Sequence, residues 1–179
     1  MQNAEKASEA SFPSSSQIAS ERGKVFGKGL LEYVAFQKVF LGVIAIVGIA
    51  RLGLSVAGVP DAAVKWFSMT VVAAVGIFYY GVAVHISGFG GYKQLLPLLV
   101  IQNVLANSIV VGGIALAIAG FPNIFAAPEY SGPLYEHRQW AHILGHVVGG
   151  MGVYSVVGWG IASLVLLITK KLAPRPALA

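Results

Sequence analysis

Four long apolar stretches, separated by short segments rich in glycine and proline, constrain the fold of this sequence more than any other feature. Each stretch is about as long as the roughly 20 residues that a helix needs to cross a hydrocarbon core. The apolar residues are continuous and do not alternate as in the strands of a membrane barrel. We therefore predict an all-α, integral membrane four-helix bundle with spans at about 34–58, 64–87, 93–120 and 139–169.

The composition agrees with a chain that lies in lipid. Of its 179 residues, 56% are hydrophobic and 11% are charged, whereas about 25% of the residues in soluble domains are charged. The sequence contains no cysteine. Disulfides, thiol nucleophiles, iron–sulfur clusters and covalent c-type haem are therefore excluded.

Residues 1–32 differ in composition from the rest and are rich in serine, alanine and glutamate. We expect them to form a mobile tail, followed by the bundle at 33–171 and a short C-terminal tail at 172–179. The N-terminus does not resemble a secretory signal, because Glu5 and Glu9 stand where such a signal is positively charged.

The end of this tail is basic and partly apolar. Val25 and Phe26 lie among Arg22, Lys24 and Lys28, together with three glycines that weaken any helix. We expect a solvated linker here, and the alternative is contact with an anionic membrane surface.

The distribution of Lys and Arg predicts the orientation. With the N-terminus inside, nine of the twelve Lys and Arg residues lie on the inner side, which is the bias of cytoplasmic loops. Trp66 and Trp140 then fall at the outer ends of spans two and four. We predict a multi-pass protein with cytoplasmic termini, and the absence of a transit-like N-terminus favours a bacterial plasma (inner) membrane.

The same bias accounts for the net charge of +5 without nucleic-acid binding, because no basic patch interleaved with aromatics lies outside the tail. Gly88 and Gly90 lack the preceding strand and the spacing of a phosphate-binding loop. No nucleotide partner is therefore expected.

Arg51 is an ionisable residue inside a span, where a charge is costly unless it is paired or hydrated. Helical spacing places Gln37 and Ser55 on its side of the first span. Arg51 lies about 9 Å from the outer surface. It either reaches outer headgroups or pairs with Asp61, Glu129 or Glu136, or else it holds an anionic substrate, a cofactor propionate or a partner's carboxylate.

The sharpest pattern is in the fourth span. In a regular helix His142 and His146 share a face with Gly145 and Gly149, and Val153 and Gly160 continue it. We expect this small face to point into the bundle, where it would admit a neighbouring helix or a flat cofactor. Histidines four residues apart can also chelate a metal ion, with Glu129, Glu136 or His137 as further ligands.

The alternatives for these two histidines are haem b or divalent-metal ligation, ordinary hydrogen bonding between helices, and proton transfer. His85 ends the second span about 29 Å from the outer edge, whereas His146 lies about 9 Å from it. The two cannot share one iron within a single copy. At the inner interface we expect His85 to be solvated, with headgroup binding or proton relay as alternatives.

The third span carries amides, Gln102, Asn103 and Asn107, of which Asn103 and Asn107 share a face. We expect hydrogen bonds between helices, with a solute or quinone pocket as the alternative. The long outer loop, residues 121–140, contains prolines and aromatics and is expected to be a semi-rigid strap. It either anchors at the interface or contacts a protein partner.

Three functions remain open, besides a lipid-acting enzyme. The first is a non-catalytic accessory or scaffold subunit of a larger membrane complex, with other membrane subunits or further copies of the chain as partners. It is favoured because no nucleophile is paired with a base and the polar residues lie at different depths. The second is a haem b or metal-binding redox subunit with ligands on the fourth helix. The third is a small-solute carrier or channel lined by Arg51, Asn107 and His146.

Overall fold

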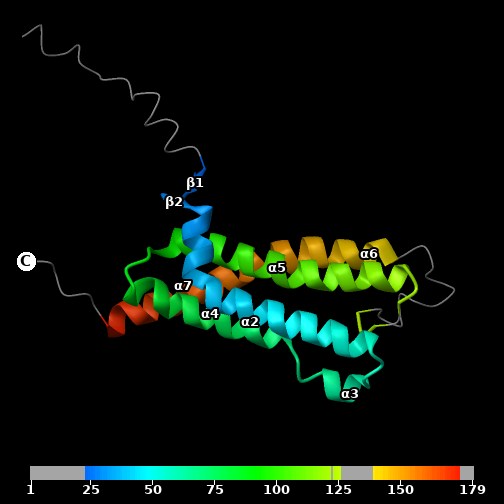
Figure 1. Ribbon diagram of the computed structural model, residues 1–179. Helices are drawn as coiled ribbons and strands as arrows, with labels where there is room; N and C mark the ends of the chain where they lie inside the picture. Colours follow the sequence, from blue (N-terminus) through cyan, green and yellow to red (C-terminus); the bar gives the residue numbers. More distant parts are fainter. Residues whose placement is uncertain (1–22, 122, 126–138, 174–179) are drawn as a thin grey trace, which may run out of the picture.

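The computed structural model describes residues 23–121, 123–125 and 139–173. Within them, four helices are long and apolar enough to cross a membrane: Leu30–Val56, Ala62–Ile86, Tyr92–Ile118 and Trp140–Leu172. This confirms the all-helical class and indicates an integral membrane protein. The helices run along a common axis, and the first and last described residues lie at the same end of the molecule (Figure 1).

The helices begin and end close to the predicted bounds. The first span is α2 (Leu30–Val56), which starts before the expected residue 34. The second consists of a short helix α3 (Asp61–Val64) and then α4 (Met69–Ile86). The third is α5 (Tyr92–Ile118). The fourth joins three segments without a break: α6 (Gln139–Gly145), the π-helix η4 (His146–Val153) and α7 (Tyr154–Leu172).

Side chains near the helix starts explain where the helices begin. The carboxylate of Glu32 accepts a hydrogen bond from the backbone N–H of Gly29 at 2.7 Å, and the hydroxyl of Ser68 accepts one from Val71 at 3.3 Å. Gln94 does the same for Gly91 at 2.8 Å. Each contact satisfies a backbone donor that has no partner within its helix.

A β-hairpin precedes α2, in a region that we expected to be a mobile tail extending to residue 32. Strands β1 (Lys24–Val25) and β2 (Lys28–Gly29) pair antiparallel, with Val25 opposite Lys28. Phe26 and Gly27 form the turn with φ angles of 50° and 83°, the left-handed backbone of a type I′ hairpin turn. The hairpin stands off the side of the bundle (Figure 1).

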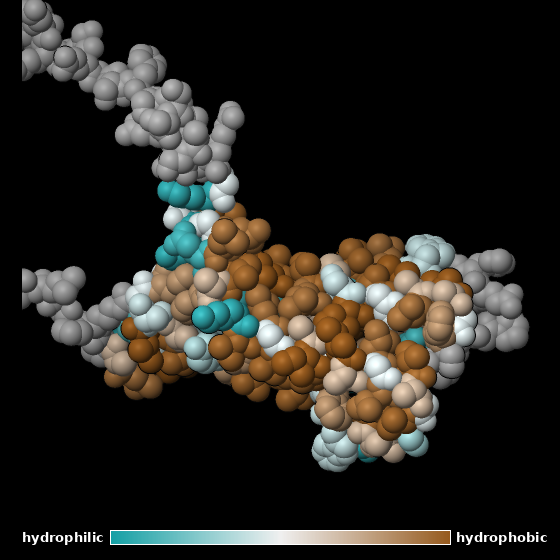
Figure 2. Space-filling view, in the orientation of Figure 1, coloured by the Kyte–Doolittle hydropathy of each residue, from teal (hydrophilic) through white to brown (hydrophobic). Residues whose placement is uncertain are grey.

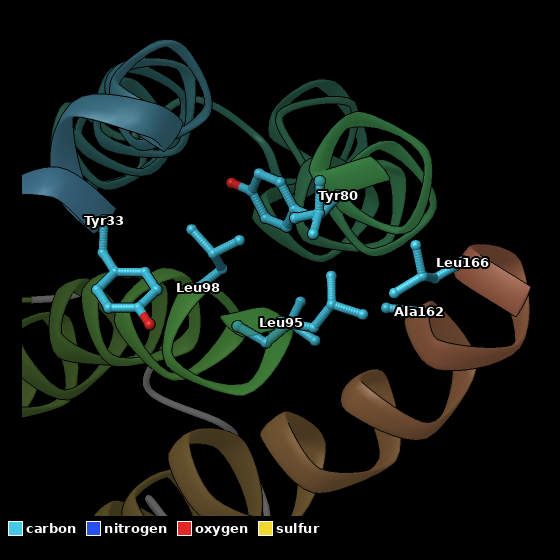
Figure 3. Packing of buried hydrophobic residues seen from close by; sticks show 8 residues of the cluster. Tyr33, Tyr80, Leu95, Leu98, Ala162 and Leu166 are labelled. Carbon is cyan, nitrogen blue, oxygen red and sulfur yellow. The ribbon is translucent and has the colours of Figure 1, made fainter. Parts of the chain in front are cut away.

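The helices form a diamond in which α4 and α5 each pack against both α2 and α7. Figure 3 shows α2 and α7 on opposite sides of this pair. The core at this level is apolar apart from two tyrosine hydroxyls, and it consists of Tyr33, Tyr80, Val84, Leu95, Leu98, Leu99, Ala162 and Leu166. Gly81 lets α4 and α7 approach closely, because a Cβ there would meet Val165 and the carbonyl of Ala162.

Candidate functional site: a polar bridge beside a π-helix

The π-helix changes which residues of the fourth span face the bundle. An α-helix turns about 100° per residue, so the nine steps from His146 to Ser155 would place these side chains on opposite faces. A π-helix bonds residue i to i+5 and holds more residues in each turn. In the structure both side chains contact α5, His146 through Asn107 and Ser155 through Asn103. The segment contains Gly149, Gly150 and Gly152, and glycine weakens α-helical geometry.

These four side chains form what we call the polar bridge: Asn103, Asn107, His146 and Ser155. The amide of Asn103 donates to the hydroxyl of Ser155 at 3.0 Å. The amide of Asn107 donates to the backbone carbonyl of Asn103 at 2.9 Å, and its oxygen lies 2.9 Å from Nδ1 of His146. Ser155 in turn donates to the carbonyl of Met151 inside the π-helix. The bridge therefore joins α5 to both η4 and α7.

The bridge also fixes the tautomer of His146. Because the Nδ2 of Asn107 donates to a carbonyl, the atom that faces the imidazole is its Oδ1, which can only accept. Nδ1 of His146 must therefore donate, and in the neutral ring the lone pair lies on Nε2. Histidine ligands of metals are held in the same way by a partner on the other ring nitrogen.

The second histidine of the predicted pair lies beside the first. The ring centroids of His142 and His146 are 5.0 Å apart and the rings are inclined at 47°. Among the described residues, no group of three or more His, Cys, Asp and Glu side chains is placed to hold a metal ion. The further ligands that we considered, Glu129, Glu136 and His137, lie outside the described residues. The two imidazoles alone are fewer than the three or four ligands of a typical metal site.

The prediction that the small face of the fourth span points inward is wrong. A Cβ added at Gly145, Gly149 or Gly160 would meet no atom within 4 Å, and Val153 is 56% exposed. Gly150 is buried instead, and a Cβ there would collide with the amide of Asn107. The π-helix accounts for the positions within and after it, because the prediction assumed α-helical spacing throughout, whereas Gly145 lies in α6 before the π-helix begins. The buried row continues with Ser155, Gly158, Ala162 and Leu166.

Arg51 lies at the far end of α2 from the hairpin. Its Nη1 donates to the backbone carbonyl of Phe67 at 3.1 Å, and its Cζ lies 5.8 Å from the ring centre of Phe125. Its Nε is buried and has no hydrogen-bond partner within the described part of the chain. Ser55, one turn further on, accepts from the backbone N–H of Ile124 at 2.6 Å. Both side chains fasten the loops at this end of the bundle.

The remaining amides lie elsewhere. Gln102 donates to the carbonyl of Ala73 at 3.0 Å and thereby joins α5 to α4, next to Gly76. Gln37 is 1% exposed, and neither of its amide atoms has a hydrogen-bond partner among the described residues. Gln37 and Arg51 lie on the same helix but have no hydrogen-bond partner in common within the described part of the chain. The predicted polar stripe of α2 is therefore not one site.

His85 is buried, where we expected a solvated side chain. It is 7% exposed, and its Nε2 lies 2.8 Å from the carbonyl oxygen of Ala173. Nearby, the indole of Trp159 donates to the carbonyl of Tyr92 at 2.7 Å, and Lys170 lies 4.2 Å from the ring centre of Tyr92. These contacts attach α7 to the ends of α4 and α5. His85, on α4, thus contacts the C-terminal end of the fourth span, far from His146.

Sequence reasoning missed Ser155 and Gly150. Their five-residue separation matches the i to i+5 bonding of a π-helix, but a glycine and a serine at this spacing do not by themselves predict one. It also missed Tyr33 and Gln94, which hold the hairpin through the carbonyls of Val25 and Phe26. Any residue can supply a backbone carbonyl, so nothing in the sequence marks such a partner.

The structure does not bring the candidate residues together. Within residues 23–121, 123–125 and 139–173, no contact joins Arg51 to Asn107 or His146, and the side chains of the polar bridge bond one another or the backbone. The arrangement suits the joining of helices more than the lining of one path. No protein-family model matches the chain, and no curated protein or solved structure matches it either.

Proposed function

We propose that the protein is a non-catalytic accessory or scaffold subunit that binds a transmembrane helix of another membrane protein. One observation carries this proposal. His146 and Ser155 of the fourth span contact α5 in the polar bridge, whereas several glycines of the same span have no neighbouring atoms where a side chain would stand. Gly145, Gly149 and Gly152 have no atom within 4 Å of an added Cβ. Small residues on an open helix surface allow close approach of a second helix backbone.

Tyr154 supports a protein partner over lipid alone on this outward side. Its side chain is 66% exposed, and it lies about 21 Å along the helix from Trp140, near the middle of the span. The described residues provide no hydrogen bond to its hydroxyl. A hydroxyl in hydrocarbon without a partner is unfavourable. A neighbouring helix with a polar side chain or an open carbonyl would satisfy it.

The test compares assemblies purified in mild detergent from the native membrane. We expect Gly149→Leu to lose a co-purifying membrane protein that the parent protein retains, because the leucine fills the space for the second helix. Gly53→Leu is the matched control, since Gly53 is an open glycine on α2. Tyr154→Phe should weaken the same assembly. Equal recovery of the partner with all three variants, or a monomeric parent protein, would contradict the proposal.

We further propose that the chain lies in a bacterial plasma membrane with both termini in the cytoplasm. The excess of Lys and Arg at the hairpin end supports this orientation. The first and last described residues lie at the same end of the molecule, which agrees with an even number of spans (Figure 1).

A second candidate function is a haem b or metal-binding redox subunit. The observation that favours it is the lone pair on Nε2 of His146, beside the ring of His142. A reduced-minus-oxidised visible spectrum of the protein from its native membrane tests it. A b-type spectrum that disappears in His146→Ala would support this function. A flat spectrum together with no bound metal would rule it out.

A further inference from the structure

We propose that the β1–β2 hairpin is an anchor that binds the phosphate-bearing headgroups of anionic phospholipids at the membrane interface. The proposal does not depend on the proposed function, since lipid binding and partner binding use different ends and faces of the molecule. Four observations support it: the position of the hairpin, its attachment to the bundle, its exposed apolar residues and its charge.

The hairpin has the right position. Figure 1 shows β1 and β2 beside the bundle at one of its ends, not continuing along its axis. When the helices cross a membrane, a segment that projects sideways from their ends lies along the interface. Figure 2 shows hydrophilic residues gathered on the hairpin and hydrophobic residues over the middle of the bundle.

The hairpin is attached firmly enough to hold its side chains in place. The hydroxyl of Tyr33 donates to the carbonyl of Val25, and the amide of Gln94 donates to the carbonyl of Phe26, both at 2.8 Å. Tyr33 itself is 1% exposed. The two bonds connect the hairpin to α2 and α5. It is therefore a fixed part of the fold and not a free linker.

Apolar side chains of the hairpin and of the first turn of α2 are exposed. Val25 is 48% exposed and Phe26 46%, while Leu30 and Leu31 are 62% and 82% exposed. Phe26 has a φ of 50°, a strained value for a residue with a side chain. This backbone keeps an aromatic residue at the tip of the turn. Exposed aromatic and aliphatic residues next to lysines are typical of segments that lie in the headgroup region.

The charge at this end is strongly positive. Among the described residues at the hairpin end, Glu32 is the one carboxylate, and its Oε1 lies 3.5 Å from Nζ of Lys28. No ion pair of Lys24, Lys93 or Lys171 is found within the described residues. Lysines next to a membrane surface bind anionic lipids. A soluble polyanion would leave the four apolar side chains in water, whereas a lipid satisfies both the charge and the apolar surface.

The test measures which lipid lies beside the hairpin in nanodiscs that contain the full chain. The sequence has no cysteine, so Leu30→Cys gives a single site for a fluorophore. The nanodiscs hold equal amounts of phosphatidylcholine and phosphatidylglycerol, and one of the two lipids carries brominated chains that quench the fluorophore. We expect brominated phosphatidylglycerol to be enriched about fivefold at the label, the factor typical of one lysine at an anionic surface.

Variants identify the cause of the enrichment. Lys24→Gln should lower it, and Lys24→Gln with Lys28→Gln should lower it further, whereas Lys65→Gln at the other end should leave it unchanged. Phe26→Ser should reduce quenching by both lipids, because the tip then inserts less. Added inorganic phosphate should not displace the lipid, since a free ion offers no apolar chains.

Several results would overturn the proposal. Equal quenching by the two lipids in the parent protein would do so, as would enrichment in the double lysine variant that is as strong as in the parent protein. Displacement of the lipid by millimolar inorganic phosphate would show that the hairpin binds a free anion and not a lipid. Because Lys24 forms no ion pair with any described residue, Lys24→Gln keeps the test valid if the double variant folds poorly.

Discussion

At the residue scale, Asn107 is the side chain on which the polar bridge depends. Its amide nitrogen donates to the carbonyl of Asn103 within α5, and its amide oxygen accepts a hydrogen bond from His146 of η4. We expect Asn107→Leu to lower the free energy of unfolding by about 1 kcal/mol, since hydrogen bonds between membrane helices contribute up to about 1.7 kcal/mol. Unfolding in mixed detergent micelles measures this change. Ser108→Ala, at the neighbouring exposed position, is the control, and an equal loss there would contradict the special role of Asn107.

Gly149 and Gly150, three and four residues after His146, differ in what surrounds them. A Cβ at Gly150 would collide with the Asn107 amide, whereas a Cβ at Gly149 would meet nothing within 4 Å. We expect Gly150→Ala to destabilise the protein by about 1–3 kcal/mol, the range for overpacking. Gly149→Ala should be neutral or slightly stabilising, because alanine favours a helix. Equal effects in the same unfolding measurement would argue against the inward orientation of Gly150.

Individual residues also show how far sequence reasoning reaches. The prediction that Asn103 and Asn107 join helices follows from the need of an amide in lipid for a partner, and the structure shows Asn103 bonded to Ser155 and Asn107 bonded to His146. Arg51 was expected to reach outer headgroups or a carboxylate, and two of the carboxylates considered, Glu129 and Glu136, lie outside the described residues. Its described hydrogen-bond partner is the carbonyl of Phe67, which depends on the path of a loop and not on residue type. The sequence identifies which side chains need partners more readily than it identifies the partners.

At the element scale, the predicted spans agree with the helices because length and hydropathy are enough to define them. The hairpin and the π-helix were not predicted, for two different reasons. The turn of the hairpin uses Phe26-Gly27 in place of the Asn-Gly that typically marks a type I′ turn. The π-helix has no residue signature in an apolar segment. The prediction therefore assumed α-helical spacing, and the inward face that it gave for the fourth span differs from the observed one.

The π-helix itself is testable by shortening it. We expect deletion of Gly152 to restore α-helical spacing, in which the eight remaining steps of about 100° leave His146 and Ser155 about 80° apart around the helix. The two hydrogen bonds to α5 can then no longer both keep their alignment. One of the two substitutions, His146→Leu or Ser155→Ala, should therefore lower the free energy of unfolding less in the deletion variant than in the parent chain. In the parent chain each should lower it by about 1 kcal/mol. A double-mutant cycle measures this coupling, and unchanged effects of both substitutions in the deletion variant would contradict it.

At the scale of the whole molecule, the two ends of the bundle differ in their chemistry. The hairpin end carries Lys24, Lys28, Lys170 and Lys171, and His85 and Lys170 attach α7 there. At the other end, Arg51 and Ser55 hold the loops through backbone groups. Between the ends lie the polar bridge, which contacts α5, and the open glycines of the fourth span, where an added Cβ would meet no atom within 4 Å. The proposed membrane orientation, lipid contact and partner contact thus involve separate parts of one small fold.

The orientation predicts which positions reagents can reach from each side of the membrane. Single cysteines at Lys24 and Lys171 mark the hairpin end, and a cysteine at Trp66, which is 82% exposed, marks the other end. In intact bacterial cells or right-side-out vesicles, we expect an impermeant maleimide to label Trp66→Cys, and Lys24→Cys and Lys171→Cys only after permeabilisation. Labelling of Lys24→Cys and Lys171→Cys on opposite sides would contradict four complete spans. The reverse pattern would keep the four spans and overturn the proposed cytoplasmic location of the termini.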